Sequence, residues 1–368
     1  MTILLLASLA HATPLFTERF DRLSGLFKER IVAPKGGPLG TYEVANSVIT
    51  FVVEPRTKRF TSIEQKVELR GLAWLDVSAR VAVTGVSNPP ADAVCGLFVR
   101  FDTGEVVPSR PCANRADAEP HHRWVQVPKG ARDAWVGVMM SAPGTLVVDD
   151  VVADATPPDL KTLVRGSFVY HSLGNDTFRD DQTDLNESIW QGALGFLGGK
   201  AGRELTYWKY PDAATLETFT GQTGAAWVTP TDVHSVLKTD SRALVLAAAS
   251  ALGNPGPLLG EGLAIHLAGD WDGRDTRLTT RTQVNEGRAA TLASLLTPTS
   301  FAAEAPDRAF PMAGAFVSWV AATKGAEAVS ALYSGLRADG TAAQNQAVLE
   351  RVLGTPLPAL EAAFRASL

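Results

Sequence analysis

The alternation of apolar and polar residues predicts a β-rich region between residues 42 and 152. Residues 48–53 are rich in β-branched side chains, and apolar and polar residues alternate along 60–69 and 75–83, which turns one face of each strand inward. Turns rich in Gly, Pro, Asn and Asp separate these runs. The pattern predicts an antiparallel β-sandwich over residues 41–155. Further strands are expected at 97–101 and 134–139.

A proline-containing segment, residues 155–159, predicts a domain boundary, because Pro157 and Pro158 interrupt both helices and strands. After it, longer apolar segments such as 243–252 are typical of buried helices. We expect residues 160–368 to form a mostly helical domain with a small edge sheet, which makes the chain a two-domain α+β protein. The expected strands are 204–210 and 233–237, and the expected helices are 185–197, 213–220, 243–252, 258–267, 288–295, 312–324, 326–336, 342–353 and 357–367.

The apolar residues that follow residue 12 recur at helical spacing. Phe16, Phe20, Leu23 and Phe27 lie three or four residues apart, which places them on one face of a helix. A helical segment is therefore expected within residues 13–40, ended by prolines and glycines at 34–38.

Residues 1–12 resemble a signal peptide. An apolar run at 3–9 is followed by Ala10-His11-Ala12, a small-x-small cleavage pattern, so cleavage before Thr13 is expected. No Lys or Arg precedes the run, and a buried N-terminal segment is the alternative. Cleavage would make the protein secreted, or periplasmic in the cell envelope.

Composition excludes some classes of partner. The formal net charge is −5 and no basic stripe occurs, which argues against nucleic acid. No apolar stretch is long enough to cross a membrane. The two cysteines, Cys95 and Cys112, both lie in the β-rich region. In an exported protein they form either a cross-strand disulfide or two buried thiols.

The β-rich region resembles the jelly rolls of carbohydrate-binding modules. The resemblance rests on residues 60–67, on Trp124 with 127–131, and on the segment 144–151 with its Asp-Asp-Val end. It implies a fold more than a ligand. Trp74, Trp124 and Trp135 are the candidates for stacking on a sugar ring, with core packing as the alternative for each.

The segment from Leu205 onward resembles the gluzincin-like (MA-like) peptidases. In that plan a helix carries His-Glu-x-x-His, and the next helix supplies a glutamate ligand from Glu-Gly-Leu-Ala. Residues 255–264 match the second part, which places Glu261 at the third ligand position, and His234 lies in the expected cleft-edge strand. By register, Ser241 takes the place of the first histidine, Arg242 that of the catalytic glutamate and Val245 that of the second histidine.

This replacement removes the zinc site as well as the general base, so no cofactor is expected. Serine is a poor zinc ligand, valine is none, and arginine keeps its proton at neutral pH. We also expect the Arg242 guanidinium to occupy the space of the lost cation and to pair with Glu261.

The sequence favours an exported pseudopeptidase that binds a protein, a peptide or a glycan through its cleft and jelly roll. The residues expected to bind are Glu261, His234, His266 and Trp124. One alternative is an active hydrolase with a noncanonical site near His234, Glu261 and His266. A structural envelope module is the other.

Overall fold

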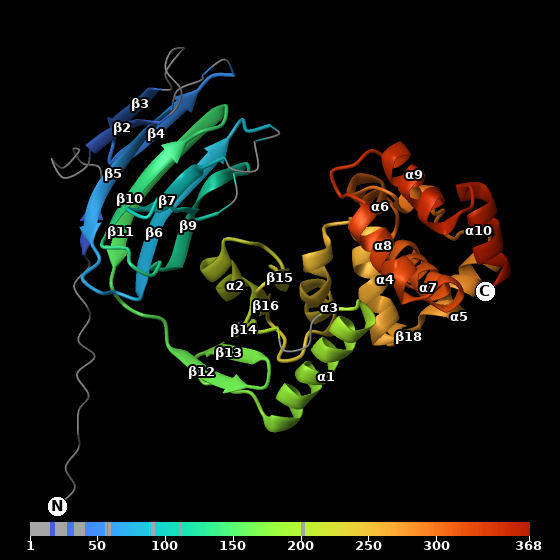
Figure 1. Cartoon of the computed structure of the whole chain (residues 1–368). Helices are drawn as coiled ribbons and strands as arrows, with labels where there is room; N and C mark the ends of the chain where they lie inside the picture. The colour runs from blue at the N-terminus through green and yellow to red at the C-terminus, as the bar shows by residue number, and fades with distance from the viewer. Residues whose placement is uncertain are drawn as a thin grey trace, which may run out of the picture. The chain divides into compact units, whose positions relative to one another are not determined.

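The computed structural model describes residues 15–18, 28–32, 41–55, 57, 60–87, 89, 93–110, 112–199 and 203–368 (Figure 1). The chain forms two compact units. Unit 1 contains the chain up to Asp159 and, in addition, Asp212–Gly224, whereas unit 2 contains Leu160–Pro211 and Ala225–Leu368. The sequence does not predict the return of Asp212–Gly224 to unit 1.

Unit 1 is an antiparallel β-sandwich, as the sequence predicts (Figure 1). Its first sheet has the strand order β3-β4-β11-β6-β9, with β1 paired to β11, and its second has the order β2-β5-β10-β7-β8. The strands are β1 (Phe16–Glu18), β2 (Lys28–Val32), β3 (Thr41–Ala45), β4 (Val48–Val53), β5 (Phe60–Glu68), β6 (Trp74–Thr84), β7 (Cys95–Phe101), β8 (Val106–Pro108), β9 (Arg115–Gln126), β10 (Asp133–Met140) and β11 (Gly144–Asp154).

The core of unit 1 lies between the two sheets. Along β6 the burial alternates residue by residue, so that Val77 and Val81 face the core while Arg80 faces outward. Burying one such valine contributes about 1.5–3 kcal/mol. Cys95 and Cys112 form a disulfide, which is the first of the two expected arrangements. The bridge links β7 to the segment before β9.

The prediction of a helix within residues 13–40 is wrong where the structure describes this segment. Phe16–Glu18 pairs with β11, and Lys28–Val32 pairs with β5, both as antiparallel strands. Backbone hydrogen bonding to an open sheet edge outweighs a helical spacing of apolar residues, which is only a local preference. The predicted signal peptide lies outside the described residues.

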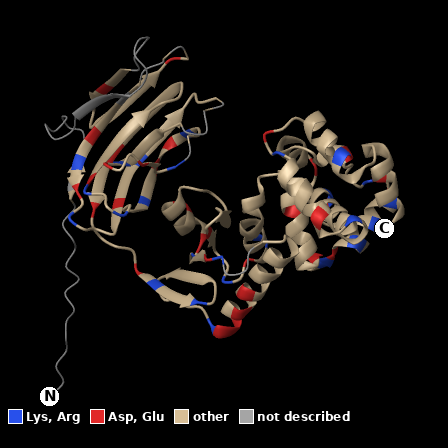
Figure 2. Ribbon diagram, in the orientation of Figure 1, with Lys and Arg blue, Asp and Glu red and all other residues tan. Residues whose placement is uncertain are grey.

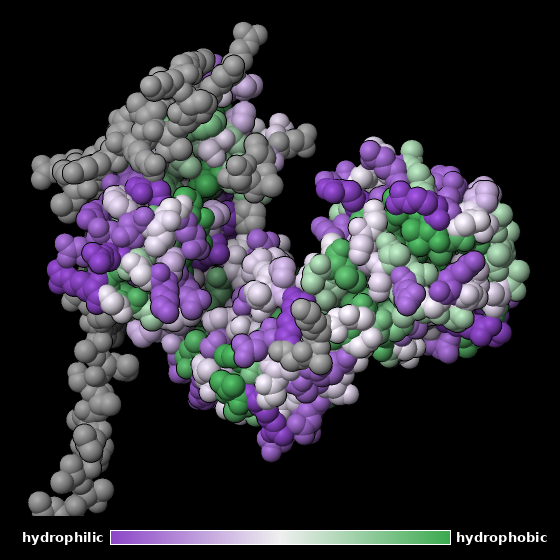
Figure 3. All heavy atoms as spheres, in the orientation of Figure 1, coloured by the Kyte–Doolittle hydropathy of each residue, from purple (hydrophilic) through white to green (hydrophobic). Residues whose placement is uncertain are grey.

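Unit 2 begins with a mixed sheet of strand order β12-β13-β14-β16-β15. β12 and β13 form an antiparallel hairpin, whereas β14 pairs in parallel with both β13 and β16. The strands are β12 (Leu160–Arg165), β13 (Phe168–Leu173), β14 (Leu205–Lys209), β15 (Ala226–Val228) and β16 (Asp232–Ser235). Val164 of β12 is 70% exposed. Hydrophobic and hydrophilic side chains are interspersed on the surface of the hairpin in Figure 3.

The remainder of unit 2 is mostly helical, as expected, and also contains the short antiparallel strands β17 (Asp270–Trp271) and β18 (Arg274–Asp275). The helices are α1 (Asp180–Phe196), α3 (Ser241–Ala249), α4 (Pro257–Ala268), α5 (Thr276–Asn285), α6 (Pro298–Ala303), α7 (Pro306–Lys324), α8 (Ala326–Gly335), α9 (Ala342–Leu353) and α10 (Leu357–Ala366); α2 (Ala213–Thr220) belongs to unit 1. Acidic residues gather in the first turn of α1 (Figure 2), where their negative charges interact favourably with the helix dipole. None of the described helices is long and apolar enough to cross a membrane.

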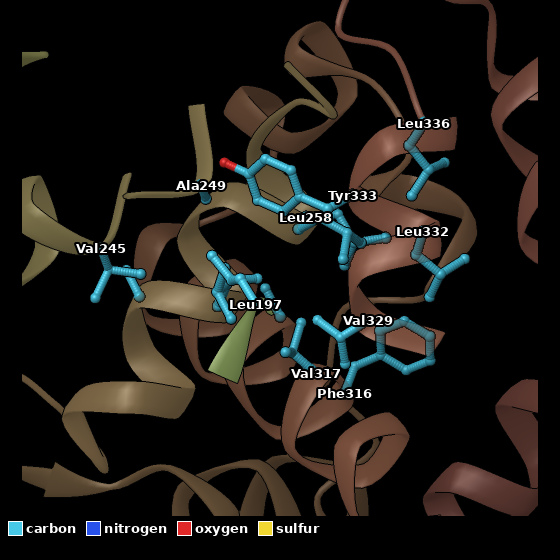
Figure 4. Packing of buried hydrophobic residues seen from close by; sticks show 14 of the residues in the cluster. Leu197, Val245, Ala249, Leu258, Phe316, Val317, Val329, Leu332, Tyr333 and Leu336 are labelled. Atoms are coloured by element: carbon cyan, nitrogen blue, oxygen red, sulfur yellow. The ribbon is translucent and has the colours of Figure 1, made fainter. Parts of the chain in front are cut away.

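A shared apolar core holds these helices together. Figure 4 shows Val245 of α3, Leu258 of α4 and Val317 of α7 among the buried side chains of this core. The prediction of a helix at 288–295 is wrong, since only the end of this segment, Ala293–Leu295, forms a short 3-10 turn. Instead, the polar segment Thr276–Asn285 forms α5, whose buried residues Thr276, Thr280 and Gln283 are all polar and gave no apolar signal.

Candidate functional site

The start of α3 carries Ser241 and Arg242, two of the residues that the sequence singles out. The Asp240 carboxylate caps the helix by accepting a hydrogen bond from the Ala243 amide at 2.9 Å. Ser241 and Arg242 follow in the first turn. Val245 is 1% exposed and packs into the core. The apolar face of α3 is therefore used for packing, and its first turn carries the polar residues.

Arg242 and Glu261 form the predicted ion pair between α3 and α4. The Arg242 Nε atom donates to Glu261 Oε2 at 2.5 Å, and Nη2 donates to Oε1. The guanidinium therefore binds both carboxylate oxygens. The Glu261 side chain is 13% exposed and that of Arg242 is 51% exposed. This hydrogen bond raises the pKa of Arg242, which stays charged.

The residues around Glu261 do not fit a zinc ion. A zinc site needs three or four ligands around a divalent cation, but the Glu261 carboxylate is already paired with the Arg242 guanidinium, whose positive charge would repel that ion. Tyr333 of α8 lies nearby: burial raises its pKa, and the charge of Glu261 raises it further. Tyr333 was not predicted, because it follows Glu261 by more than seventy positions and no local motif marks it.

His234 lies in a row of aromatic rings across the sheet of unit 2. The register places His171, Trp208, His234 and Trp227 side by side on β13, β14, β16 and β15. The Trp208 and His234 rings are stacked with centroids 5.8 Å apart. The Tyr210 hydroxyl lies 2.8 Å from His234 Nδ1. Burial lowers the pKa of His234 to about 4, so its imidazole is neutral at pH 7.

His266 lies apart from Glu261, although both belong to α4. Its Nδ1 lies 3.0 Å from the Ser318 hydroxyl of α7, and its ring packs against Phe196 at 5.2 Å. Five residues along a helix rotate a side chain by about 140°, so Glu261 and His266 point in different directions. No cluster of His, Cys, Asp and Glu in the described part of the chain could hold a metal ion. The hydrolase alternative near His234, Glu261 and His266 thus gains no support from this geometry.

Trp124 lies on the outward face of the first sheet of unit 1. Its ring packs against Phe219 of α2, with centroids 4.9 Å apart, and against His122 at 4.5 Å. Phe219 also contacts Trp74 at 5.8 Å. Two of the three tryptophans expected to stack on a sugar therefore pack against a helix of the same unit.

The outward face of the second sheet of unit 1 carries a buried ion pair beside the third tryptophan. Ile63 of β5 faces the core, so its neighbours Ser62 and Glu64 face outward; nevertheless, Glu64 is only 4% exposed. Arg100 Nη2 donates to Glu64 Oε2 at 2.6 Å, and the Ser62 hydroxyl donates to Oε1 at 2.7 Å. The Arg100 guanidinium also stacks 4.0 Å from the Trp135 ring centroid.

The sequence pointed to Trp135 but not to its polar partners. The alternation along 60–69 could have placed Ser62 and Glu64 on the face opposite Ile63. The link from Glu64 to Arg100 on β7 required the strand order, which only the fold supplies. Gly137 of β10 keeps this face closely packed, since a Cβ there would lie 2.6 Å from the Ile63 carbonyl oxygen.

No family model and no curated protein matches the chain. Among solved structures, the enzymatically active domain of tailspike protein 4 from bacteriophage CBA120 is 13% identical with a TM-score of 0.27, and the match covers 35% of this chain and 19% of that one. The CBM22-1 xylan-binding domain from Paenibacillus barcinonensis Xyn10C is 13% identical, with a TM-score of 0.26 and coverages of 39% and 94%. A mutant of the family 29 carbohydrate-binding module CBM29-2 complexed with cellulohexaose is 9% identical, with a TM-score of 0.25 and coverages of 39% and 92%. Carbohydrate-binding modules are thus among the structural neighbours, at similarities too low to identify a ligand. None of these matches bears on the gluzincin-like resemblance of residues 160–368.

Proposed function

We propose that the protein is an exported, non-catalytic glycan-binding protein whose sugar site lies on the outward face of β5, β7 and β10. The observation that supports this proposal is the buried Glu64–Arg100 pair beside Trp135, on a face turned away from the core. Export is supported by the Cys95–Cys112 disulfide, since disulfides persist in oxidising compartments.

The chemistry of this face suits a sugar. The buried Glu64 carboxylate holds the Arg100 guanidinium in a fixed position, and guanidinium N–H groups can donate to sugar hydroxyls. The flat Trp135 ring can pack against the C–H face of a pyranose. A buried ion pair is weak evidence for a role in stability, because the cost of desolvation offsets the attraction. Recognition of a ligand would account for the burial of the Glu64–Arg100 pair on this face.

The test compares two tryptophan variants of the full-length protein. Affinity electrophoresis in soluble xylan and calorimetric titration with cellulohexaose are suitable, because these sugars are named for two of the similar modules. Trp135→Ala is expected to weaken binding at least tenfold, which corresponds to about 1.4 kcal/mol. Trp124→Ala is the matched control and is expected to leave affinity unchanged, because its ring packs on Phe219.

Three outcomes would count against the sugar site. Equal loss of affinity in both variants would indicate a general effect on the fold. Loss in Trp124→Ala alone would move the site to the first sheet, beside the tryptophan that the sequence favours. Failure of the natural protein to bind any of a broad panel of plant, microbial and animal glycans would remove the proposal.

We further propose that unit 2 is a peptidase-like scaffold without catalysis. The support is the guanidinium of Arg242, which occupies both oxygens of the carboxylate that a zinc ion would need. The active hydrolase remains the competing hypothesis. Stoichiometric zinc in the purified protein, together with peptide cleavage that a chelator blocks, would favour it over the scaffold.

A further inference from the structure

A cavity of about 360 Å³ opens in unit 2 between α4, α5 and α7. One part of its wall is apolar and is formed by Ile265, Ala315 and the Trp319 side chain. Protein sites for small ligands combine such apolar walls with a few polar groups. The cavity lies on the His266 side of α4, away from the Arg242–Glu261 pair, and plays no part in the function proposed above.

The polar part of the wall can both donate and accept hydrogen bonds. His266 and the Ser318 hydroxyl lie 3.0 Å apart, and Phe196 packs against the imidazole and fixes its position. Burial lowers the pKa of His266, so the imidazole is neutral at pH 7. Thr276 also lines the cavity, and its buried hydroxyl has no hydrogen-bond partner among the described residues. Leaving such a hydroxyl unpaired costs free energy, which a hydrogen bond to a ligand would recover.

The charged groups at the cavity are balanced and partly engaged. Arg277 contributes a positive charge, and its Nη2 donates to the Ser367 carbonyl oxygen at 2.7 Å. Asp275 contributes a negative charge, and its carboxylate caps α5 by accepting from the Leu278 amide at 2.7 Å. With a neutral His266 the set of side chains in the wall carries no net charge. It therefore favours neither an anion nor a cation.

We infer that this cavity binds a neutral, hydroxylated molecule of about the size of one sugar ring. Hydroxyl groups donate and accept, as do the serine, the threonine and the neutral imidazole that line the wall. The Trp319 ring and the aliphatic side chains match the apolar face of such a ring. The cavity has the volume that about twelve water molecules occupy in the liquid, which is enough for a single hexose.

The test uses the full chain carrying Trp135→Ala, so that sugar binding at the sandwich does not contribute. Saturation-transfer NMR measures binding of the neutral sugars glucose, galactose, mannose and N-acetylglucosamine, and of two charged analogues of glucose, glucuronate and glucosamine. At least one neutral sugar is expected to bind in the millimolar range. Glucuronate and glucosamine are expected to bind more weakly than glucose.

Substitutions then place the signal in the cavity. Ala315→Leu fills the cavity and is expected to abolish binding, whereas Ser318→Ala removes one hydrogen bond and is expected to weaken binding about fivefold. Ser330→Ala is the matched control, because Ser330 does not line the cavity and its hydroxyl has no hydrogen-bond partner among the described residues. If Ala315→Leu does not fold, the two serine variants still decide.

Three results would overturn the inference. These are the absence of binding by every neutral sugar, tighter binding of a charged analogue than of glucose, and equal affinities in Ser318→Ala and Ser330→Ala. Because the sugar site on the sandwich is already disabled in this background, none of these results bears on the function proposed above.

Discussion

At the scale of single residues, the Arg242–Glu261 pair shows how a mostly buried carboxylate is satisfied between two helices. Glu261 is mostly buried, so its carboxylate needs a cation or several donors. The guanidinium supplies two donors in the geometry that a carboxylate prefers. Arg242 is half-exposed, so its own charge remains partly hydrated.

We expect Arg242→Ala to destabilise unit 2 by about 1–2 kcal/mol, because it leaves the Glu261 carboxylate without its donors. Thermal unfolding measures the effect. Arg337→Ala is the control, because Arg337 pairs with Asp339 on the surface and no measurable change is expected. Adding Glu261→Gln to Arg242→Ala is expected to restore part of the loss. A single variant as stable as the natural protein would show that the pair contributes nothing.

The candidate residues could be predicted from the sequence only where a motif set their register. The Arg242–Glu261 pair was predictable, because counting back from Glu-Gly-Leu-Ala fixes the position of Arg242. Glu64 and Arg100 lie on strands that are neighbours of β10 but distant in sequence, so their contact depends on strand order. Tyr333 was missed for a similar reason.

At the scale of elements, strong periodicity was a reliable guide. The alternating strands β5 and β6 and the apolar helices α3 and α4 were predicted within a few residues, whereas α7 begins at Pro306 and not at the predicted residue 312. The hairpin of β12 and β13 was missed, because only its second strand, Phe168–Leu173, has buried side chains, and this strand is short. Helix α2 was predicted, but its place on unit 1 depends on a tertiary contact of Phe219 that no local pattern encodes.

Gly221 ends α2 and allows this contact. It has a positive φ of 71°, and a Cβ there would lie 2.7 Å from Arg123 Nη1 and 2.9 Å from the Ser109 carbonyl oxygen. Gly221→Ala therefore combines left-handed strain with a steric clash, and we expect a cost of about 2–4 kcal/mol. Calorimetric unfolding measures the stability of unit 1.

Gly354→Ala is the matched control for this substitution. Gly354 ends α9 with a φ of 70°, but nothing lies within 4 Å of the position of its Cβ. Only the strain of the left-handed backbone remains, for which we expect about 1–2 kcal/mol. Equal losses of stability in the two variants would show that α2 does not pack closely against the sandwich of unit 1.

At the scale of the whole molecule, each unit contains a buried, neutral histidine. Burial, together with the positive charges of Arg110 and Arg115, lowers the pKa of His121 in unit 1 to about 3. Burial lowers the pKa of His234 in unit 2 to about 4. The ordinary pKa of histidine is about 6.5. As the pH falls below this value, the unfolded chain therefore takes up protons before the folded chain does.

It follows that the stabilising contribution of each histidine is complete above about pH 6.5 and is lost on acidification. Between this pH and the folded pKa, the free energy of unfolding is expected to fall by up to about 1.4 kcal/mol per pH unit for each histidine. Carboxylates with lowered pKa values, such as Asp176 and Glu187, act in the same direction at lower pH, so the histidine effect needs a difference measurement.

His234→Phe preserves the ring packing and removes the titration. Denaturant unfolding of unit 2 at a series of pH values is expected to show the difference between His234→Phe and the natural protein shifting in favour of the variant from about pH 6.5 down to about 4. Parallel pH profiles would mean that His234 takes up its proton equally readily in the folded and unfolded chain, contrary to its burial among aromatic rings.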